Sequence, residues 1–157
     1  MDLFLEEQLD RALEEVAHRS MRHRLTRGRP FGLRSLEALA LEVLLKEEQQ
    51  KNFEITPSRL SAGMEVQSPV LSPVLTSLEK LGHISCRRDE NDRRSRLISL
   101  TKQGREVAGR FSAEKKKKCS EMVAFLGEQD AREFARLLHR LTEYMDREAE
   151  KEEKGGG

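Results

Sequence analysis

The chain has 157 residues, enough for one domain with a full core or for a small domain joined to an oligomerisation region. Apolar and charged residues each make up 36% of the sequence and aromatic residues only 4%, which favours amphipathic helices over a large monomeric core. The two cysteines are too few for a disulfide framework, and no apolar run approaches the roughly 20 residues that a membrane span needs.

Two amphipathic helices are predicted in the first third of the chain. Residues 3–20 place apolar side chains at helical spacing among acids, and glycines and a proline interrupt the pattern between residues 28 and 32. A second helix is expected from Ser35, whose hydroxyl can cap it, and the polar run 46–52 weakens its end.

The next two helices have the spacing of a helix-turn-helix. Thr56 precedes a proline, which is the pattern of a capped helix start, and Gly63 is expected to end this short helix in a left-handed conformation. Ser68, again before a proline, is expected to start a helix that runs to Leu81. Two helices joined by a short turn that contains glycine are typical of a helix-turn-helix.

A proline stands inside the second of these helices. Pro73 has no N–H to donate, so the helix should lose one hydrogen bond and bend. Two interpretations stay open: Ser68 caps a bent helix, which is the favoured one, or the helix starts only at Ser72 and is short.

Residues 82–101 predict a β-hairpin with an arginine-rich tip. Gly82 is expected to end the preceding helix, and Thr101 is expected to cap the next one. Between Lys80 and Lys118 there are thirteen Lys or Arg residues and five acids. Such a basic block suits a phosphate backbone, although charges that merely solvate helix faces would also produce it. Helix, two-stranded wing and helix in this order predict a winged helix-turn-helix that binds duplex DNA.

Two further helices are predicted after the wing. The first starts at Thr101 and is broken at Gly127, and Asp130 is expected to cap the second. Apolar residues recur at a spacing of three and four residues over 134–145. The tail 150–157 is charged and then glycine-rich, and is expected to be disordered.

The apolar stripes of the first and the last two helices lie outside the helix-turn-helix and need a cover. A second copy of the chain is the simplest cover, and packing of the stripes on one another in a monomer is the alternative. The predicted fold is therefore mainly α with a small β-wing, a winged helix-turn-helix plus a helical dimerisation lobe. Its expected parts are a dimerisation helix and linker (1–30), the DNA-binding region (31–104), dimerisation helices (105–149) and the tail (150–157).

Three signatures between Ile55 and Gly104 resemble the MarR family of bacterial transcriptional regulators. They are LEKLG at 78–82, RRDENDRR at 87–94 and LTKQG at 100–104, and their order and spacing make the resemblance specific. The resemblance implies a homodimer that represses or activates transcription under the control of a small molecule or of oxidation. It also implies double-stranded DNA as partner, with a pseudo-palindromic operator whose half-sites are about 10 bp apart.

The recognition helix of such a protein lies in the major groove with its first residues at base edges. The polar or exposed candidates for base or phosphate contact at this helix are Gln67, Ser68, Pro69, Ser72, Thr76 and Ser77. Many members of the family carry arginine where this chain has Pro73. Base readout is therefore expected to be weak, and readout of DNA shape correspondingly more important.

The wing is the expected source of that shape readout. The resemblance places Arg94 in the minor groove, with Asp92 orienting its guanidinium, and assigns Arg87, Arg88 and Arg93 to phosphates. Any one of these arginines could also be an ordinary solvated surface charge.

Other functional classes have weaker support in the sequence. Cys119 follows four lysines that favour a reactive thiolate, so it is a candidate for redox sensing, although a free cysteine is more often a small buried apolar residue. No phosphate loop, nucleophile arrangement or metal-ligand spacing stands out, so no enzyme, metal or cofactor is predicted. A winged-helix module for protein–protein assembly is the alternative to a DNA-binding regulator. A cytoplasmic location is expected, with no membrane contact.

Overall fold

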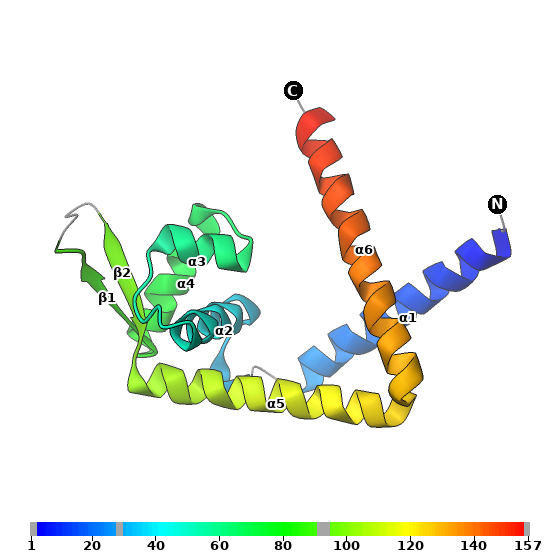
Figure 1. The fold of residues 1–157 in the computed structure, drawn as a ribbon, viewed down its shortest axis with the longest axis horizontal. Helices are drawn as coiled ribbons and strands as arrows, with labels where there is room; N and C mark the ends of the chain where they lie inside the picture. The colour runs from blue at the N-terminus through cyan, green and yellow to red at the C-terminus, as the bar shows by residue number, and fades with distance from the viewer. Residues whose placement is uncertain (1–2, 28–29, 91–94, 156–157) are drawn as a thin grey trace. The chain divides into compact units, whose positions relative to one another are not determined.

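The computed structural model describes residues 3–27, 30–90 and 95–155 (Figure 1). In chain order its elements are α1 (Leu3–Arg27), η1 (Pro30–Gly32), α2 (Ser35–Gln49), α3 (Pro57–Met64), α4 (Ser68–Lys80), β1 (Ile84–Arg88), β2 (Arg96–Leu100), α5 (Lys102–Leu126) and α6 (Glu128–Gly155). The predicted class, mainly α with a small β-wing, is confirmed. The chain divides into two compact units, Met1–Phe111 and Ser112–Gly157, with the boundary within α5.

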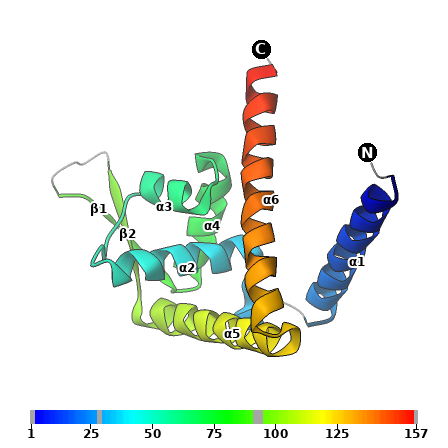
Figure 2. The same cartoon turned by 45° about the vertical axis from the view of Figure 1, so that its right-hand side comes forward.

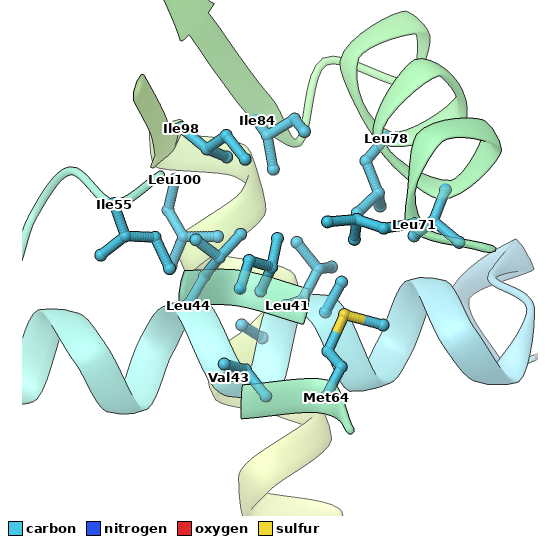
Figure 3. Packing of buried hydrophobic residues seen from close by; sticks show 14 of the residues in the cluster. Leu41, Val43, Leu44, Ile55, Met64, Leu71, Leu78, Ile84, Ile98 and Leu100 are labelled. Atoms are coloured by element: carbon cyan, nitrogen blue, oxygen red, sulfur yellow. The ribbon is translucent and has the colours of Figure 1, made fainter. Parts of the chain in front are cut away.

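The core of the first unit lies between α2, α3, α4 and the two strands. Leu41, Leu60, Leu71, Leu78 and Ile98 are its largest fully buried side chains, and they come from four helices and strands. Figure 3 shows Leu41 of α2 directed towards side chains of α4 and of the strands. Because these elements bury apolar side chains against one another, the helix-turn-helix and the wing form one packed body.

The wing is an antiparallel hairpin in which residues on the two strands face each other in a regular register. Ile84 is opposite Leu100 and Arg88 is opposite Arg96. Ile55 adds a bridge to the other edge of β2, with its N–H and C=O joined to Ile98 by hydrogen bonds of 3.0 and 2.8 Å. The segment before α3 therefore fixes the base of the wing. Figures 1 and 2 both show the hairpin beside α2, α3 and α4.

The start of α3 is as predicted, but its end is not. The Thr56 hydroxyl accepts a hydrogen bond from the Arg59 N–H at 3.2 Å, with proline next to it. Gly63 was expected to end the helix in a left-handed conformation, but it lies inside α3, and Glu65 (φ 54°) is the left-handed residue. A Cβ on Gly63 would lie 2.7 Å from a methyl carbon of Val43, so this glycine serves close packing of α3 on α2.

The prolines of α4 are accommodated in one continuous helix. α4 starts at Ser68, so the alternative of a short helix from Ser72 is wrong. Ser68 is not the cap either: Gln67 is the N-cap residue and makes no side-chain cap hydrogen bond. Pro73 lies within the helix, as expected, and its missing N–H leaves one backbone carbonyl without its helical donor.

The junction between the wing and α5 depends on two residues of the LTKQG signature. The Thr101 hydroxyl accepts from the Gly104 N–H at 3.0 Å, which confirms the cap, and it donates to the Gly82 carbonyl at 2.6 Å. A Cβ on Gly104 would lie 1.8 Å from the His83 carbonyl oxygen, a distance that no side chain tolerates. Glycine at this position therefore allows α5 to pack directly against the backbone at the start of the wing.

Three other helix boundaries differ from the sequence expectation. Arg34, not Ser35, is the N-cap residue of α2, because the Arg34 N–H donates to the Glu37 carboxylate at 2.7 Å. Asp130 does not cap α6, which starts at Glu128, directly after left-handed Gly127 (φ 82°). The tail expected to be disordered from residue 150 is helical as far as Gly155, as part of α6.

Apolar side chains remain exposed on the long helices. On α1 they are Phe4, Leu5, Leu9, Leu13, Val16 and Met21, and on α6 they are Phe134, Leu137, Leu138, Leu141, Tyr144 and Met145. They recur at helical spacing, so each helix carries an apolar stripe. None of the described helices is both long enough and apolar enough to cross a membrane.

Candidate nucleic-acid interface

The recognition helix α4 has one buried and one exposed face. Leu71, Val74 and Leu78 are buried in the core. The predicted contact residues Gln67, Ser68, Pro69, Ser72 and Thr76 are all exposed, so the structure brings five of the six candidates of this helix to one accessible surface. The Thr76 hydroxyl donates to the Ser72 carbonyl at 3.1 Å, which leaves its lone pairs available as acceptors.

Ser77 differs from the other candidates because it is half-buried and faces α2. It is among the groups that influence the pKa of Glu37, a residue of α2 whose side chain is only 3% exposed. Arg34 pairs with the same carboxylate through Nε at 2.8 Å and Nη2 at 2.7 Å. Burial alone would raise the pKa of Glu37, but hydrogen bonds from the Arg34 backbone and from the Ser77 and Arg34 side chains hold it below its ordinary value. Ser77 is therefore less accessible than the other candidates, and its expected DNA contact stays a prediction.

Two more ion pairs fix the helix-turn-helix to its surroundings. The Arg59 guanidinium on α3 binds Glu47 of α2 at 2.9 Å, and Asn52 donates to the same carboxylate at 2.9 Å. The Arg59 hydrogen bond holds the pKa of Glu47 below its ordinary value. Arg105, at the start of α5, pairs with Glu48. The end of α2 therefore uses adjacent acids to hold α3 and α5 in place.

The described arginines of the wing fall into two groups. Arg87 forms a bidentate pair with Glu54, with Nε–Oε1 and Nη2–Oε2 distances both of 2.6 Å. Arg88 and Arg96 face each other across the two strands, and neither side chain forms an ion pair with another described residue. Like charges directly opposite each other on a hairpin repel, so this pair has a cost that an anion between them would remove.

The tip of the wing lies outside the described residues. Asp92, Arg93 and Arg94, which the family resemblance assigns to the minor groove and to phosphates, all belong to this tip. Their expected roles stay predictions. Arg88 ends β1 and Arg96 begins β2, so these two are the described cations that lie nearest to this segment in the sequence.

The two free cysteines lie in different environments, and the redox role expected for Cys119 stays a prediction. Cys119 is exposed on α5. Cys86 is half-buried on β1, and burial raises the pKa of its thiol, which disfavours the reactive thiolate. Within residues 3–27, 30–90 and 95–155, no group of three or more His, Cys, Asp or Glu side chains could hold a metal ion.

A hollow of about 350 Å³ lies along the first half of α2. It is lined by Leu33, Arg34, Ser35, Ala38, Leu39, Glu42 and Phe111. The rings of Phe31 and Phe111 contact each other, with centroids 5.3 Å apart. Leu39 lines this hollow, whereas Val43, on the same helix, is buried in the core.

Comparisons with known proteins agree with this arrangement. The structure matches FabT of Streptococcus pneumoniae, solved in complex with DNA, with a TM-score of 0.73 over 90% of this chain and 97% of that chain, at 22% identity. It matches the MepR–DNA complex of S. aureus with a TM-score of 0.63 over 90% and 96% of the two chains, at 18% identity. YusO of Bacillus subtilis matches at 0.68 over 91% and 98%, at 20% identity.

The fold is that of the MarR-type winged helix-turn-helix regulators. Among curated proteins, an uncharacterized HTH-type transcriptional regulator of Bacillus subtilis, YdgJ, is 33% identical over 88 residues. These residues are 56% of this chain and 54% of YdgJ, so the match spans about half the length of that relative. No family model matches the chain.

Sequence reasoning missed two features of the wing. Arg96 was not among the expected contact residues, although the register of a hairpin through residues 84–100 would have placed it opposite Arg88. The partner of Arg87 was missed because Glu54 lies 33 residues earlier, and no local pattern connects the two.

Proposed function

We propose that this chain is a homodimeric, sequence-specific DNA-binding transcriptional regulator of the MarR type, acting as a repressor under the control of a small molecule. The observation that carries the proposal is the exposed polar face of α4 beside a wing whose Arg88 and Arg96 have no acidic partner among the described residues. A helix of this kind reads the major groove and an arginine-bearing wing reads the adjacent backbone and minor groove. FabT and MepR, which share the fold, were solved bound to DNA.

The role is non-catalytic and belongs in the cytoplasm, where a bacterial chromosome lies. Binding is expected to depend more on backbone and shape than on base edges. The candidate contact residues exposed at α4 are serines, a threonine, a proline and the preceding glutamine, none of which makes the bidentate contact to guanine that arginine makes. Phosphate contacts release counterions, so the affinity should fall steeply with salt.

The test is selection of bound DNA from a random duplex pool, followed by affinity for the enriched duplex at two salt concentrations. We expect a pseudo-palindrome with half-sites about 10 bp apart and salt-sensitive binding. The variant R88A/R96A should weaken binding by roughly 1–3 kcal/mol per lost specific contact and reduce the salt slope. The matched variant K115A/K116A removes the same charge from α5. Equal losses in both variants would mean that general charge, not the wing, holds DNA.

Dimerisation is proposed from the exposed apolar stripes of α1 and α6. A helix that exposes six large apolar side chains on one stripe gains stability only when another surface covers it. Sedimentation of the wild-type chain and of L138E should show a dimer and a monomer respectively at micromolar concentration. A wild-type monomer at that concentration would contradict the proposal.

The competing function, a protein–protein assembly module, has one observation in its favour. Phe53 is 60% exposed in the connection between α2 and α3, next to the base of the wing. Aromatic side chains of this kind are enriched in protein interfaces. Failure to enrich any duplex in the selection above would favour this function over DNA binding.

A further inference from the structure

The pair between Glu54 and Arg87 occupies a distinct place on the wing. Ile55 is joined by two backbone hydrogen bonds to Ile98, so the residue before it is held against the edge of β2. Strand β1 pairs with the other edge of β2 and places Arg87 opposite Leu97. Side chains alternate along strands, and Ile84 and Ile98 are buried in the core, so Arg87 and Glu54 both lie on the outer face of the sheet. The ion pair therefore crosses β2 on its solvent side.

The pair is both well formed and accessible. Its two hydrogen bonds satisfy the Nε and Nη2 donors of Arg87, and the Glu54 carboxylate uses both of its oxygens. The side chains are 47% and 37% exposed, respectively, so either group can change partner without unfolding of the wing. The contact holds the pKa of Glu54 below its ordinary value, so the carboxylate is ionised at neutral pH.

The ion pairs of Glu47 and Glu48 hold helices in place, and they differ from the Glu54–Arg87 pair in their exposure. Their side chains are 17% and 15% exposed, and their arginines lie on helices that the pairs hold against α2. Glu54 is more than twice as exposed, and the backbone of its segment is already fixed by the bridge at Ile55. The wing base therefore does not need this pair for its position.

Carboxylate and phosphate oxygens compete for the same face of a guanidinium, because both match its planar fork of N–H donors. Arg88 and Arg96, on the same two strands, have no carboxylate partner among the residues whose placement is described. The arginines of the wing therefore differ: Arg87 is already paired with an acid of the same chain, whereas the other two have no such partner among the described residues.

We propose that Glu54 is an intramolecular competitor of the DNA backbone for Arg87, and that it lowers the affinity of the wing for DNA by keeping this guanidinium engaged. The inference rests on the DNA-binding function proposed above and concerns the regulation of that same surface. Removing the carboxylate should free one cation at the base of the wing for a phosphate. If Glu54 only supported the fold, removal of its carboxylate would weaken DNA binding instead.

The test compares wild type, E54Q, R87Q and E54Q/R87Q on the duplex enriched by the wild-type chain, at several salt concentrations. Glutamine keeps the size of the side chain and removes its charge. We expect E54Q to bind roughly 3- to 10-fold more tightly at low salt, with a log–log salt slope steeper by about 0.9, the value for one additional phosphate contact. In the R87Q background the same substitution should have no effect, because the competed group is gone.

E90Q is the matched control, since Glu90 is an exposed acid of the same wing that acts on Arg87 only through space. A gain in E90Q equal to that in E54Q, or a gain in E54Q that persists beside R87Q, would overturn the proposal in favour of a general charge effect. Weaker or unchanged binding by E54Q would overturn it in favour of a positioning role. If the wild-type chain itself binds no duplex, the proposed function fails too, and that outcome is distinct from the others.

Discussion

The winged-helix region from α2 to β2 and the long helix α6 use their apolar side chains in opposite ways. In the winged-helix region, leucines such as Leu41, Leu60 and Leu78 are completely buried against neighbouring elements of the same chain. In α6, Leu137, Leu138 and Leu141 are all more than 40% exposed, although their spacing is as regular. Regular apolar spacing therefore predicts a helix in both places, but it does not tell which surface covers the stripe.

The core of the winged-helix region stabilises a single chain, whereas the apolar stripe of α6 can add stability only when another surface covers it. The winged-helix region has a closed core and should unfold cooperatively by itself. α6 lacks such a cover, so its contribution should depend on protein concentration if a second copy provides it. Four comparisons of variants test this contrast, in order of decreasing expected effect.

The largest effect is expected at Gly104, where α5 meets the winged-helix region. G104A should lower the free energy of unfolding by about 3–5 kcal/mol, because the new Cβ would overlap the His83 carbonyl oxygen and the helix start would have to shift. Gly109, one turn and a half further along α5, has no atom within 4 Å of its ideal Cβ. G109A should therefore stabilise the protein by up to about 1 kcal/mol through helix propensity.

Urea denaturation of the two glycine variants measures both effects. Equal losses in G104A and G109A would contradict the distinction between a packed and an open part of the same helix.

The second effect compares a buried with an exposed leucine. L78A should cost about 2–5 kcal/mol at every protein concentration, because Leu78 is fully buried and its truncation leaves a cavity. L138A removes the same atoms from a side chain that is 45% exposed in the single chain, and its cost should be present at high protein concentration and shrink on dilution if a second copy covers α6. Thermal unfolding at two concentrations distinguishes the cases. A concentration-independent loss in L138A as large as that in L78A would show that α6 is covered within its own chain.

A smaller effect is expected from the cap at Thr101. T101V should destabilise the protein by about 1–2 kcal/mol, since it removes the acceptor for the Gly104 N–H and the donor to the Gly82 carbonyl. Thr142 on α6 donates only to the His139 carbonyl of its own helix, so T142V is the control and should change stability by less than about 0.5 kcal/mol. A loss in T142V that matches T101V would refute the special role of the junction.

The smallest effect is confined to acid pH and concerns Glu37. Its pKa in the folded chain lies below its ordinary value, so its ionised form contributes stability above about pH 4.3, and this contribution is lost as the pH falls through the folded pKa. Unfolding free energies of wild type and E37Q between neutral and acid pH should therefore converge as the pH falls. A constant difference between the two proteins would contradict the pH dependence assigned to this carboxylate.

Several elements of the fold and the site could be predicted from short stretches of sequence. Thr56 and Thr101 cap helices as expected, because a cap hydrogen bond joins residues three positions apart. The hairpin between Gly82 and Thr101 was predicted for a similar reason, since strand length and tip composition are local properties. The exposed face of α4 followed from helical periodicity.

The features that were missed depend on contacts between distant residues. Gly63 resembled a helix stop, but the tight approach of Val43 from α2 explains the glycine, and Glu65 takes the left-handed conformation instead. Arg87 was assigned to phosphates, and its pairing with Glu54, 33 residues earlier in the chain, had no local signal. The tail looked polar enough to be disordered, yet α6 continues through it to Gly155.

The sequence by itself determined the order of helices and strands, most of the local caps and the concentration of arginines at the wing. Hydrogen bonds between near neighbours and the periodicity of side chains are sufficient for these. Only the tertiary structure decided which arginines are engaged, with Arg87 held by Glu54 and with Arg88 and Arg96 left facing each other. The physical reason is that ion pairing depends on distance in space, and the bridge between Ile55 and Ile98 brings together residues that the chain separates.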